Sequence, residues 1–473
     1  MDMSPSNKGT TKADLIVVAN RLPVRRVKRG SKQSWETSPG GLVAALRPLL
    51  RRESERGRQG AWVGWSGARG GAGYKPFHHE NVYNLPLTIS REHIEGYYDG
   101  MSNQTLWPLY HDVVRKPLYR RKWFRAYEIV NQYFAENVAS IAAKNATVWV
   151  HDYHLHLVPG MLREQRPDLR IGYFLHIPLP GRGLFAQLPW RSQIIKGTMG
   201  ADVVGFQTRG AARNFVDLAR WYAGAEPVRG GVRLDGRRID IDAFPISIDS
   251  RYIDEIARRD ETRARAQTFR DRVDGRTIML GVDRMDYTKG IDIRLRAFQE
   301  LLREGRADPS EVVLVQSAVP TREGVEQYAD LRSSIEELVG QINGEFGEVG
   351  RVAVQYLRQN LPMDELVALY LAADIMLVTP YRDGMNLIAK EFVASHHDIR
   401  GRLVLSEFTG ASLELNKALL VNPHDLDGLV NTMEQALTMD EQDAEKRMRS
   451  MRRTVFKRDV FAWADGFMER LSG

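Results

Sequence analysis

The chain has 473 residues, of which 43% are apolar and 27% are charged, a balance that excludes a disordered or fibrous protein. Its 67 Lys and Arg residues against 60 Asp and Glu residues give a formal charge of +7, which permits anionic ligands without requiring nucleic acid. Cysteine is absent, which excludes disulfide frameworks, thiolate metal sites and cysteine nucleophiles. At about 150 residues per domain, the length predicts roughly two to four domains.

The N-terminal segment is polar and lacks the apolar core of a signal peptide. Farther along, no apolar run approaches the ~20 residues of a membrane-spanning helix. These features predict a disordered tail over residues 1–13 on a cytoplasmic protein.

Short apolar runs alternate with helix-like stretches, which is typical of a parallel sheet covered by helices. The runs form two series. The first covers residues 15–19, 147–150, 171–175 and 202–206. The second covers residues 277–282, 312–316, 352–357, 375–379, 403–406 and 419–421. Because the runs are apolar on both faces, they predict an α/β fold with two Rossmann-like, doubly wound parallel-sheet domains facing a central cleft.

A charged, helix-like stretch at residues 251–272 separates the two series, so we expect the domain junction near residues 245–250. The expected organisation is an N-terminal domain over residues 14–247, a C-terminal domain over residues 248–455 and a C-terminal helix over residues 456–473. The helical pattern at this end runs through residues 445–471 and places Trp463, Phe467 and Leu471 on one face. That apolar face predicts a helix that packs back on the N-terminal domain.

Ligands of doubly wound sheets bind at the carboxyl ends of strands, so the residues directly after each run are the candidates. Arg21 follows the first run and can hold a phosphate in a bidentate manner. Gly41 opens a helix whose N–H groups also suit a phosphate, although an ordinary structural turn explains this glycine as well. Asp152 and His176 follow the second and third runs, where a helix cap or a core histidine is the structural alternative to a hydroxyl-binding group.

Three aromatic residues of the first half, Trp65, Tyr98 and Trp107, combine flat faces with polar tips. Such side chains suit sugar rings, and ordinary core packing is the alternative. A basic run at residues 25–29 lies in an expected loop and is interpreted mainly as a solvated face.

In the second half, Arg284 and Lys289 lie in one loop after a strand, where two cations can converge on a diphosphate. Residues 379–391 combine a strand end, a glycine turn and a helix start, whose free N–H groups suit phosphate. Helix capping alone explains Asp383 or Asn386 but not the whole set. Glu391, near the same end, suits ribose hydroxyls.

Long segments of the chain resemble the trehalose-6-phosphate synthase family, which comprises retaining glycosyltransferases of the GT-B fold. The segments run in family order from residue 15 to the C-terminus. They are VANRLPV, SPGGLVAAL, GWSG, SNQTLWPLYHD, VWVHDYHLHLVP, GVDRMDYTKGID, INGEFGEVG, LVTPYRDGMNLIAKEFV, VLSEFTGAS and LLVNPHD.

This resemblance implies two sets of binding residues. The acceptor, glucose 6-phosphate, would be held by Arg21, Trp65, Tyr98, Trp107, Asp152 and Arg322. The donor would be held by Gly41, His176, Arg284, Lys289, Asp383, Gly384, Met385, Asn386, Leu387 and Glu391. Among these, the family assigns catalytic roles to Arg284, Lys289, His176 and Asp383.

The implied reaction transfers glucose from UDP-, ADP- or GDP-glucose to the anomeric hydroxyl of glucose 6-phosphate with retention, giving trehalose 6-phosphate. The resemblance implies front-face attack in which the leaving phosphate takes the acceptor proton, with no cofactor and no metal. The expected partners are these small molecules, with no nucleic acid and no membrane. The nucleotide base and a homo-oligomeric state are left open.

The sequence departs from the family pattern in the loop after His176. Leu179 replaces a Phe, Gly183 replaces a Glu, and Arg182 is added between Gly181 and Gly183. A smaller departure is Tyr381, where the family commonly has Leu. These changes keep alternatives open: a different phosphorylated acceptor such as glycerol 3-phosphate, a pseudo-glycosyltransferase that forms carbon–nitrogen bonds, or a weakly active regulator that binds sugar phosphates.

Overall fold

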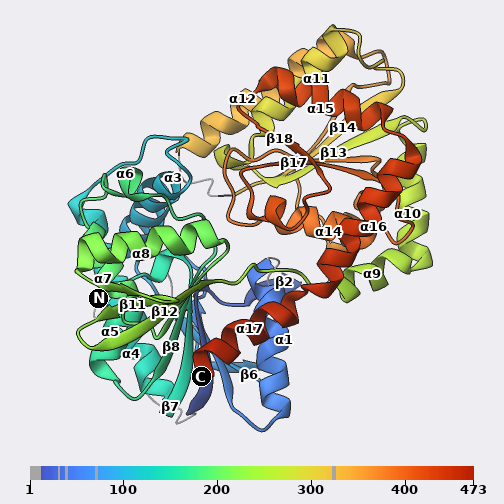
Figure 1. Cartoon of the computed structure of the whole chain (residues 1–473). Helices are drawn as coiled ribbons and strands as arrows, with labels where there is room; N and C mark the ends of the chain where they lie inside the picture. Colours follow the sequence, from blue (N-terminus) through green and yellow to red (C-terminus); the bar gives the residue numbers. More distant parts are fainter. Residues whose placement is uncertain (1–11, 30–31, 38–40, 70–72, 322–325) are drawn as a thin grey trace. The chain divides into compact units, whose positions relative to one another are not determined.

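The computed structural model describes residues 12–29, 32–37, 41–69, 73–321 and 326–473. The chain divides into two compact units (Figure 1). Unit 1 comprises Met1–Ile246 and Phe461–Gly473, and unit 2 comprises Ser247–Val460. Most of the tail expected over residues 1–13 lies outside the described residues, and the first strand already includes Ala13.

Unit 1 is built on a ten-stranded sheet with a parallel centre and antiparallel edges. In pairing order its strands are β10 (Glu226–Val228), β11 (Gly231–Leu234), β12 (Arg237–Ala243), β9 (Val203–Phe206), β8 (Arg170–Leu175), β7 (Ala142–His151), β1 (Ala13–Arg21), β4 (Gly60–Trp65), β6 (Val82–Leu87) and β5 (Phe77–His79). The parallel pairs run from β12 to β6. Central strands such as β1 and β4 are buried along almost their whole length, which explains their continuous apolar sequence.

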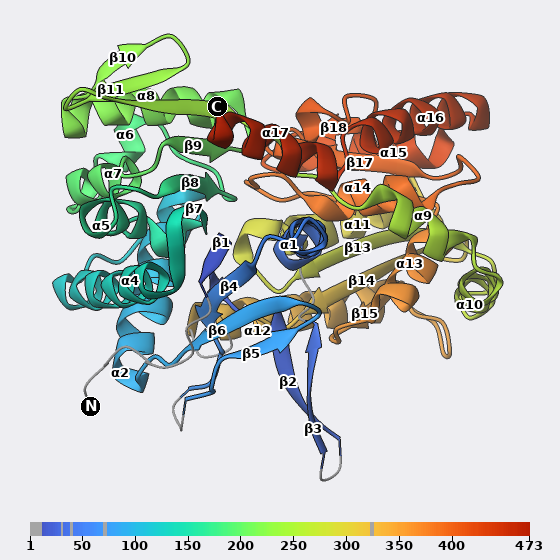
Figure 2. The same ribbon diagram turned by 90° about the horizontal axis from the view of Figure 1, so that it is seen from below.

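The helices of unit 1 cover both faces of this sheet, with α4, α5 and α7 on one face and α1 and α17 on the other (Figures 1 and 2). They are α1 (Gly41–Glu55), α2 (Arg91–His93), the π-helix η1 (Ile94–Leu106), α3 (Trp107–Tyr110), α4 (Arg121–Ile141), the 3₁₀ turn η2 (Tyr153–Leu155), α5 (Val158–Gln165), α6 (Arg182–Phe185), α7 (Arg191–Thr198), α8 (Arg209–Ala223) and α17 (Val460–Ser472). None of the helices in the described part of the chain is long and apolar enough to cross a membrane.

Helix α17 packs on the unit 1 sheet through aromatic side chains. Phe467 stacks on Trp149 of β7 with ring centroids 4.4 Å apart, and Trp463 lies 5.1 Å from the same ring. The neighbouring strand has Gly172 at this point, because a Cβ there would lie 2.7 Å from the Phe467 ring. The aromatic face read from the sequence is therefore the face that meets the sheet.

Unit 2 is built on a six-stranded, fully parallel sheet. In pairing order its strands are β15 (Val354–Leu357), β14 (Val312–Val319), β13 (Thr277–Arg284), β16 (Ile375–Val378), β17 (Arg402–Ser406) and β18 (Leu419–Val421). Its helices are α9 (Ser250–Arg258), α10 (Asp260–Asp271), η3 (Tyr287–Lys289), α11 (Ile291–Arg303), α12 (Glu326–Phe346), α13 (Met363–Ala372), α14 (Leu387–Ser395), η4 (Gly410–Leu413), α15 (Leu426–Thr438) and α16 (Glu441–Lys457). Figure 1 shows α11, α12 and α15 on one face and α9, α14 and α16 on the other.

Several local expectations differ from the structure. The stretch at residues 25–29 is a strand of the antiparallel hairpin β2 (Val24–Arg29) and β3 (Lys32–Thr37), which extends away from the unit 1 sheet (Figure 2), not a loop. The helical pattern over residues 445–471 is broken between α16 and α17, because Arg458 leaves the helical conformation. The short strands β4, β6 and β10 to β12 were not predicted, since their sequences include Gly, Pro and charged residues that weaken the strand pattern.

Candidate functional site

Arg21, at the end of β1, lies against two aromatic rings of unit 1. Its guanidinium carbon is 3.9 Å from the Trp65 ring centroid and 5.5 Å from that of Tyr98, while the Trp65 ring is buried. Gly67 leaves room for this arrangement, because a Cβ there would collide with Nη1 of Arg21. Cation–π contact therefore orients an exposed arginine without neutralising its charge, as a phosphate site requires.

Trp107 joins the same cluster through two residues that the sequence reasoning did not single out. The Tyr98 ring stacks on the His154 ring with centroids 5.9 Å apart. The His154 and Tyr153 ring centroids are 3.9 Å apart, and those of Tyr153 and Trp107 are 5.6 Å apart. Trp107 itself is 4% exposed, so its main role is to pack against the other rings of the cluster. Tyr153 and His154 follow Asp152 directly in the motif VHDYH, which is the signal that could have found them.

Asp152, directly after β7, has a backbone conformation that residues other than glycine rarely adopt, with φ of 75° and ψ of 168°. The conformation is held by neighbours: its N–H donates to Phe174 O at 2.8 Å, and its carbonyl accepts from the Tyr173 hydroxyl at 3.1 Å. Its Oδ1 accepts from the backbone N–H of His176 at 3.3 Å. The two polar residues expected at neighbouring strand ends are thus in direct contact.

The His176 ring faces another histidine, with its Nε2 3.1 Å from Nδ1 of His151. Burial lowers the pKa of His176 to about 3. Burial, and then the neighbouring His176, lowers the pKa of His151 well below its usual range. Both imidazoles are consequently neutral near pH 7, and His176 acts there as a polar, uncharged group.

In unit 2, two residues predicted separately form an ion pair. Lys289 Nζ lies 2.6 Å from Asp383 Oδ2, and the two side chains are 12% and 14% exposed. Asn386 Nδ2 donates to the same oxygen at 3.2 Å, and Asn386 also caps α14, its Oδ1 accepting from Ala389 N–H at 3.0 Å. The loop at the carboxyl end of β13 and the start of α14 are thereby joined. Arg284, the last residue of β13, is exposed.

The remaining donor candidates lie around the start of α14. Gly384 and Met385 are buried, and Met385 O accepts from Ala411 N–H at 2.9 Å. Leu387 begins the helix. Glu391 is one turn farther on, where its Oε2 accepts from the Tyr370 hydroxyl at 2.9 Å. Burial raises the pKa of Glu391, and the hydrogen bond from Tyr370 opposes that rise.

Arg294 on α11 supports this end of the unit 2 sheet from inside, and the sequence reasoning did not identify it. Its side chain is fully buried and donates to Asp283 Oδ2 at 2.6 Å, to Gln316 Oε1 at 2.8 Å and to Thr379 Oγ1 at 3.0 Å. These three acceptors belong to, or directly follow, three different strands. An arginine among apolar residues of the helix IDIRLRAF was the available signal.

Two predicted residues have no described side-chain environment. Arg322 lies outside the described residues, and Gly41 is the first residue of α1 with its surroundings undescribed.

The departing loop after His176 forms the short helix α6. The guanidinium carbon of Arg182 lies 4.1 Å from the Trp221 ring centroid. Its Nε is 3.9 Å from Asp217 Oδ2. Neither Gly181 nor Gly183 has a positive φ, and a Cβ at Gly183 would meet nothing within 4 Å. The backbone therefore does not require glycine at either position.

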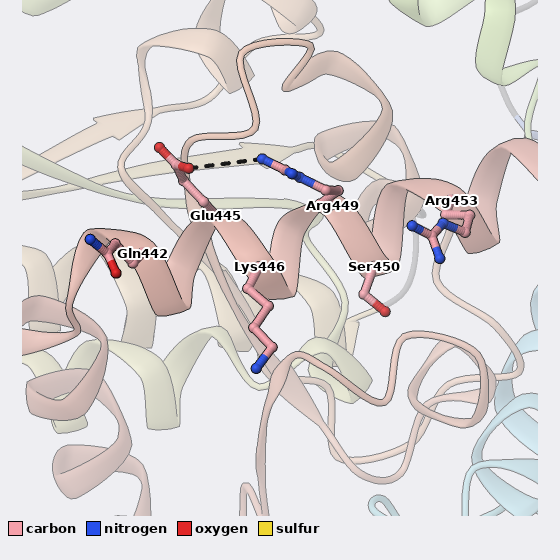
Figure 3. A pocket seen from close by; sticks show the side chains of 6 residues that line it. All are labelled: Gln442, Glu445, Lys446, Arg449, Ser450 and Arg453. Carbon is pink, nitrogen blue, oxygen red and sulfur yellow. Dashed lines mark ion pairs between the residues drawn. The ribbon is translucent and has the colours of Figure 1, made fainter.

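A surface hollow of about 360 Å³ lies elsewhere, along α16 (Figure 3). Its lining residues are Gln442, Glu445, Lys446, Arg449, Ser450 and Arg453. All six residues belong to one helix, and none of them is a candidate from the motifs. We therefore describe this hollow as the shallow face of a helix and not as a binding site. Within the described ranges, no group of three or more His, Asp or Glu residues could hold a metal ion.

Comparison with known proteins identifies the family. The model of glycosyltransferase family 20 matches residues 13–473. The chain belongs to glycosyltransferase family 20. It is 52% identical to the trehalose-6-phosphate synthase of Mycolicibacterium vanbaalenii over 97% of this chain and 96% of that protein. It is also 52% identical to the trehalose-6-phosphate synthase of Mycobacterium tuberculosis over 98% and 95% of the two chains.

Solved structures of the family agree with this match. A UDP-forming α,α-trehalose-phosphate synthase from Burkholderia vietnamiensis superposes with a TM-score of 0.90 at 33% identity, over 98% of each chain. The Burkholderia xenovorans enzyme in complex with glucose-6-phosphate has a TM-score of 0.88 at 33% identity, over 97% of this chain and 100% of that one. The E. coli protein bound with UDP-2-fluoro glucose has a TM-score of 0.87 at 29% identity, over 97% and 98%. The family resemblance and the α/β, GT-B fold class with two parallel-sheet domains are confirmed.

Proposed function

We propose that this family 20 chain is a retaining glycosyltransferase that moves glucose from a nucleoside-diphosphate glucose to glucose 6-phosphate, releasing trehalose 6-phosphate and the nucleoside diphosphate. The observation that carries the proposal is the 52% identity to a trehalose-6-phosphate synthase over 97% of the chain. UDP-glucose is the first donor to test, because solved relatives are described as UDP-forming or bound with a UDP-glucose analogue. The proposed reaction needs no cofactor, and its substrates fit a cytoplasmic location.

Unit 1 supplies the groups proposed for the acceptor. Arg21 would bind the phosphate, supported in this by Arg322, and the rings of Trp65 and Tyr98 that already hold Arg21 would border the sugar. Asp152 would accept hydrogen bonds from sugar hydroxyls. Because Trp107 is 4% exposed, only an edge of its ring would reach the acceptor.

Unit 2 supplies most of the groups proposed for the donor. An ammonium has three donors, so Lys289 keeps donors for the diphosphate while one is engaged with Asp383 at 2.6 Å. Arg284, exposed at the end of β13, would add the second positive charge. Glu391 would accept from the ribose, with the hydrogen bond from Tyr370 fixing its orientation.

The start of α14 would complete the donor site. Backbone N–H groups from Gly384 to Leu387 suit the diphosphate at a helix N-terminus. In unit 1, His176 would contact the donor glucose and the first turn at Gly41 would contribute N–H groups.

The chemistry that follows from these assignments breaks the bond between the glucose anomeric carbon and the diphosphate oxygen. The anomeric hydroxyl oxygen of the acceptor forms the new bond on the same face, and its proton passes to the departing phosphate oxygen. Lys289 and Arg284 stabilise the charge that develops on the leaving group. Asp383 is engaged with Lys289 and Asn386, which suits a role in binding the donor glucose rather than in forming a covalent intermediate.

The test is a release assay with UDP-, ADP- and GDP-glucose, each with glucose 6-phosphate or glycerol 3-phosphate. We expect nucleoside diphosphate release with glucose 6-phosphate and no added metal, and a loss for Lys289→Ala of about a hundredfold or more in kcat. Arg21→Ala should raise the KM for glucose 6-phosphate. Absence of release with every donor would overturn the enzyme assignment, and release only with glycerol 3-phosphate would replace the acceptor.

A further inference from the structure

His151 is a buried histidine that none of the proposed steps uses. It is the last residue of β7, it is fully buried, and its Nδ1 lies 3.1 Å from Nε2 of His176. Because both rings are neutral near pH 7, one of them must donate the single proton between these two nitrogens and the other must accept it.

The surroundings of His151 favour one of the two arrangements. Its Nε2 is buried with no hydrogen-bond partner among the described residues, as are the indole nitrogens of Trp149 and Trp463. These rings are packed together: the Trp149 ring centroid lies 4.8 Å from that of His151 and 5.1 Å from that of Trp463. The cluster thus already holds two indole N–H donors without an acceptor.

If His176 donated to His151, the second nitrogen of His151 would carry an N–H and become a third buried donor without an acceptor. If His151 donates through Nδ1–H, its Nε2 is a bare lone pair, and the ring adds no further buried N–H without an acceptor. Buried N–H groups without a partner are rare in folded proteins. The second arrangement is therefore the stable one, and it leaves His176 protonated at Nδ1.

We propose that His151 is a positioning residue that holds His176 as the neutral Nδ1–H tautomer, so that the ring offers a hydrogen-bond donor to a hydroxyl of the donor hexose. The role of His176 toward that hexose rests on the proposed function, whereas the tautomer is a property of the ligand-free protein. The His176 ring is further confined by Phe174, whose ring centroid is 4.6 Å away. Outer hydrogen bonds of this kind fix which histidine nitrogen faces a ligand.

The direct test is the tautomer of His176 in the ligand-free full chain. Long-range ¹H–¹⁵N spectra of protein with ¹⁵N-labelled histidine distinguish the two tautomers, and His176→Gln identifies the signals. We expect Nδ1 to carry the proton at pH 7.5. An Nε2–H tautomer would overturn the proposal, and the result does not depend on turnover, so it is separable from a failure of the proposed function.

The functional test compares three substitutions of His151. Asn places an amide N–H at the position of Nδ1, Gln places it one bond farther out, and Phe removes it. By analogy with outer hydrogen bonds to metal-bound histidines, we expect H151F and H151Q to lower kcat about ten- to a hundredfold, with the KM for glucose 6-phosphate changed by less than about twofold. H151N should retain kcat within about threefold.

Asn137→Leu is the matched control for losing a buried polar group in unit 1. Asn137 is 1% exposed, and its amide donates to Tyr133 O within α4. It should lower the melting temperature without changing kcat. If folded H151N were as slow as H151Q, or if H151Q kept the wild-type kcat, His151 would not position His176; where H151F fails to fold, these two variants and the wild-type spectrum still decide.

Discussion

Replacing Asp152 by Gly and by Ala separates the backbone strain at this position from its binding role. With φ of 75° and ψ of 168°, Asp152 lies in a region that is essentially restricted to glycine. A side chain held there costs about 1–3 kcal/mol. Both substitutions remove the carboxylate and the 3.3 Å bond from His176 N–H, so the difference between them reports the backbone alone.

At an ordinary position Ala is more stable than Gly by roughly 0.5–1 kcal/mol, because glycine loses more conformational freedom on folding. The strain at residue 152 exceeds this amount, so the order should invert. We expect D152G to be more stable than D152A by about 1 kcal/mol, which corresponds to a melting-temperature difference of about 2–4 °C for a unit of this size.

The assay is thermal unfolding of both variants in the same buffer, together with the KM of each for glucose 6-phosphate. Both should bind the acceptor poorly, since neither can accept from its hydroxyls. A D152A protein that is as stable as D152G, or more so, would refute the strain, and wild-type acceptor affinity in either variant would refute the binding role.

Arg294→Met leaves the buried carboxylate of Asp283 without its partner and should lower the free energy of unfolding of unit 2 by about 3–5 kcal/mol in chemical denaturation. The control Arg303→Met removes an exposed ion pair and should lower it by less than about 1 kcal/mol. Equal effects would contradict the buried-pair account. Gly183→Glu should change the free energy of unfolding by less than about 0.5 kcal/mol, because a side chain at this position meets no neighbouring atoms. In a competition assay it should leave the preference for glucose 6-phosphate over glycerol 3-phosphate intact. A changed preference would show that the loop selects the acceptor. Burial lowers the pKa of both His156 and His176 to about 3. The unfolded chain therefore binds more protons between about pH 3 and 6.5, and stability rises with pH over that range. Acidification from pH 7.5 to 5.5 should cost about 1.4 kcal/mol per histidine in urea unfolding. Unchanged stability would mean that burial does not lower the pKa of these rings in the folded protein.

The parallel strands that carry the site could be predicted from the sequence, because buried strands such as β13 and β16 read as unbroken apolar runs. The edge strands β10 to β12 could not, because they are short and contain Gly, Pro and charged residues that weaken the strand pattern. β12 pairs with β9, β11 with β12 and β10 with β11, so these strands depend on pairing with neighbours rather than on local preference.

The candidate residues at strand ends could be identified because one rule, ligand binding at carboxyl ends, selects them. Their pairing could not be identified in this way. Lys289 and Asp383 are 94 positions apart in the chain, and nothing local joins them. The same holds for His151 and His176, whose contact depends on β7 and β8 being neighbours in the sheet.

The most direct measurement of the central claim is the product formed from UDP-glucose labelled with ¹³C at its anomeric carbon and unlabelled glucose 6-phosphate. Carbon NMR with one-bond C–H coupling reports both the new linkage and its configuration. The account predicts a single labelled product in which the ¹³C carbon is α-linked to the anomeric oxygen of glucose 6-phosphate. A β-linked product, or label recovered only in free glucose, would contradict it.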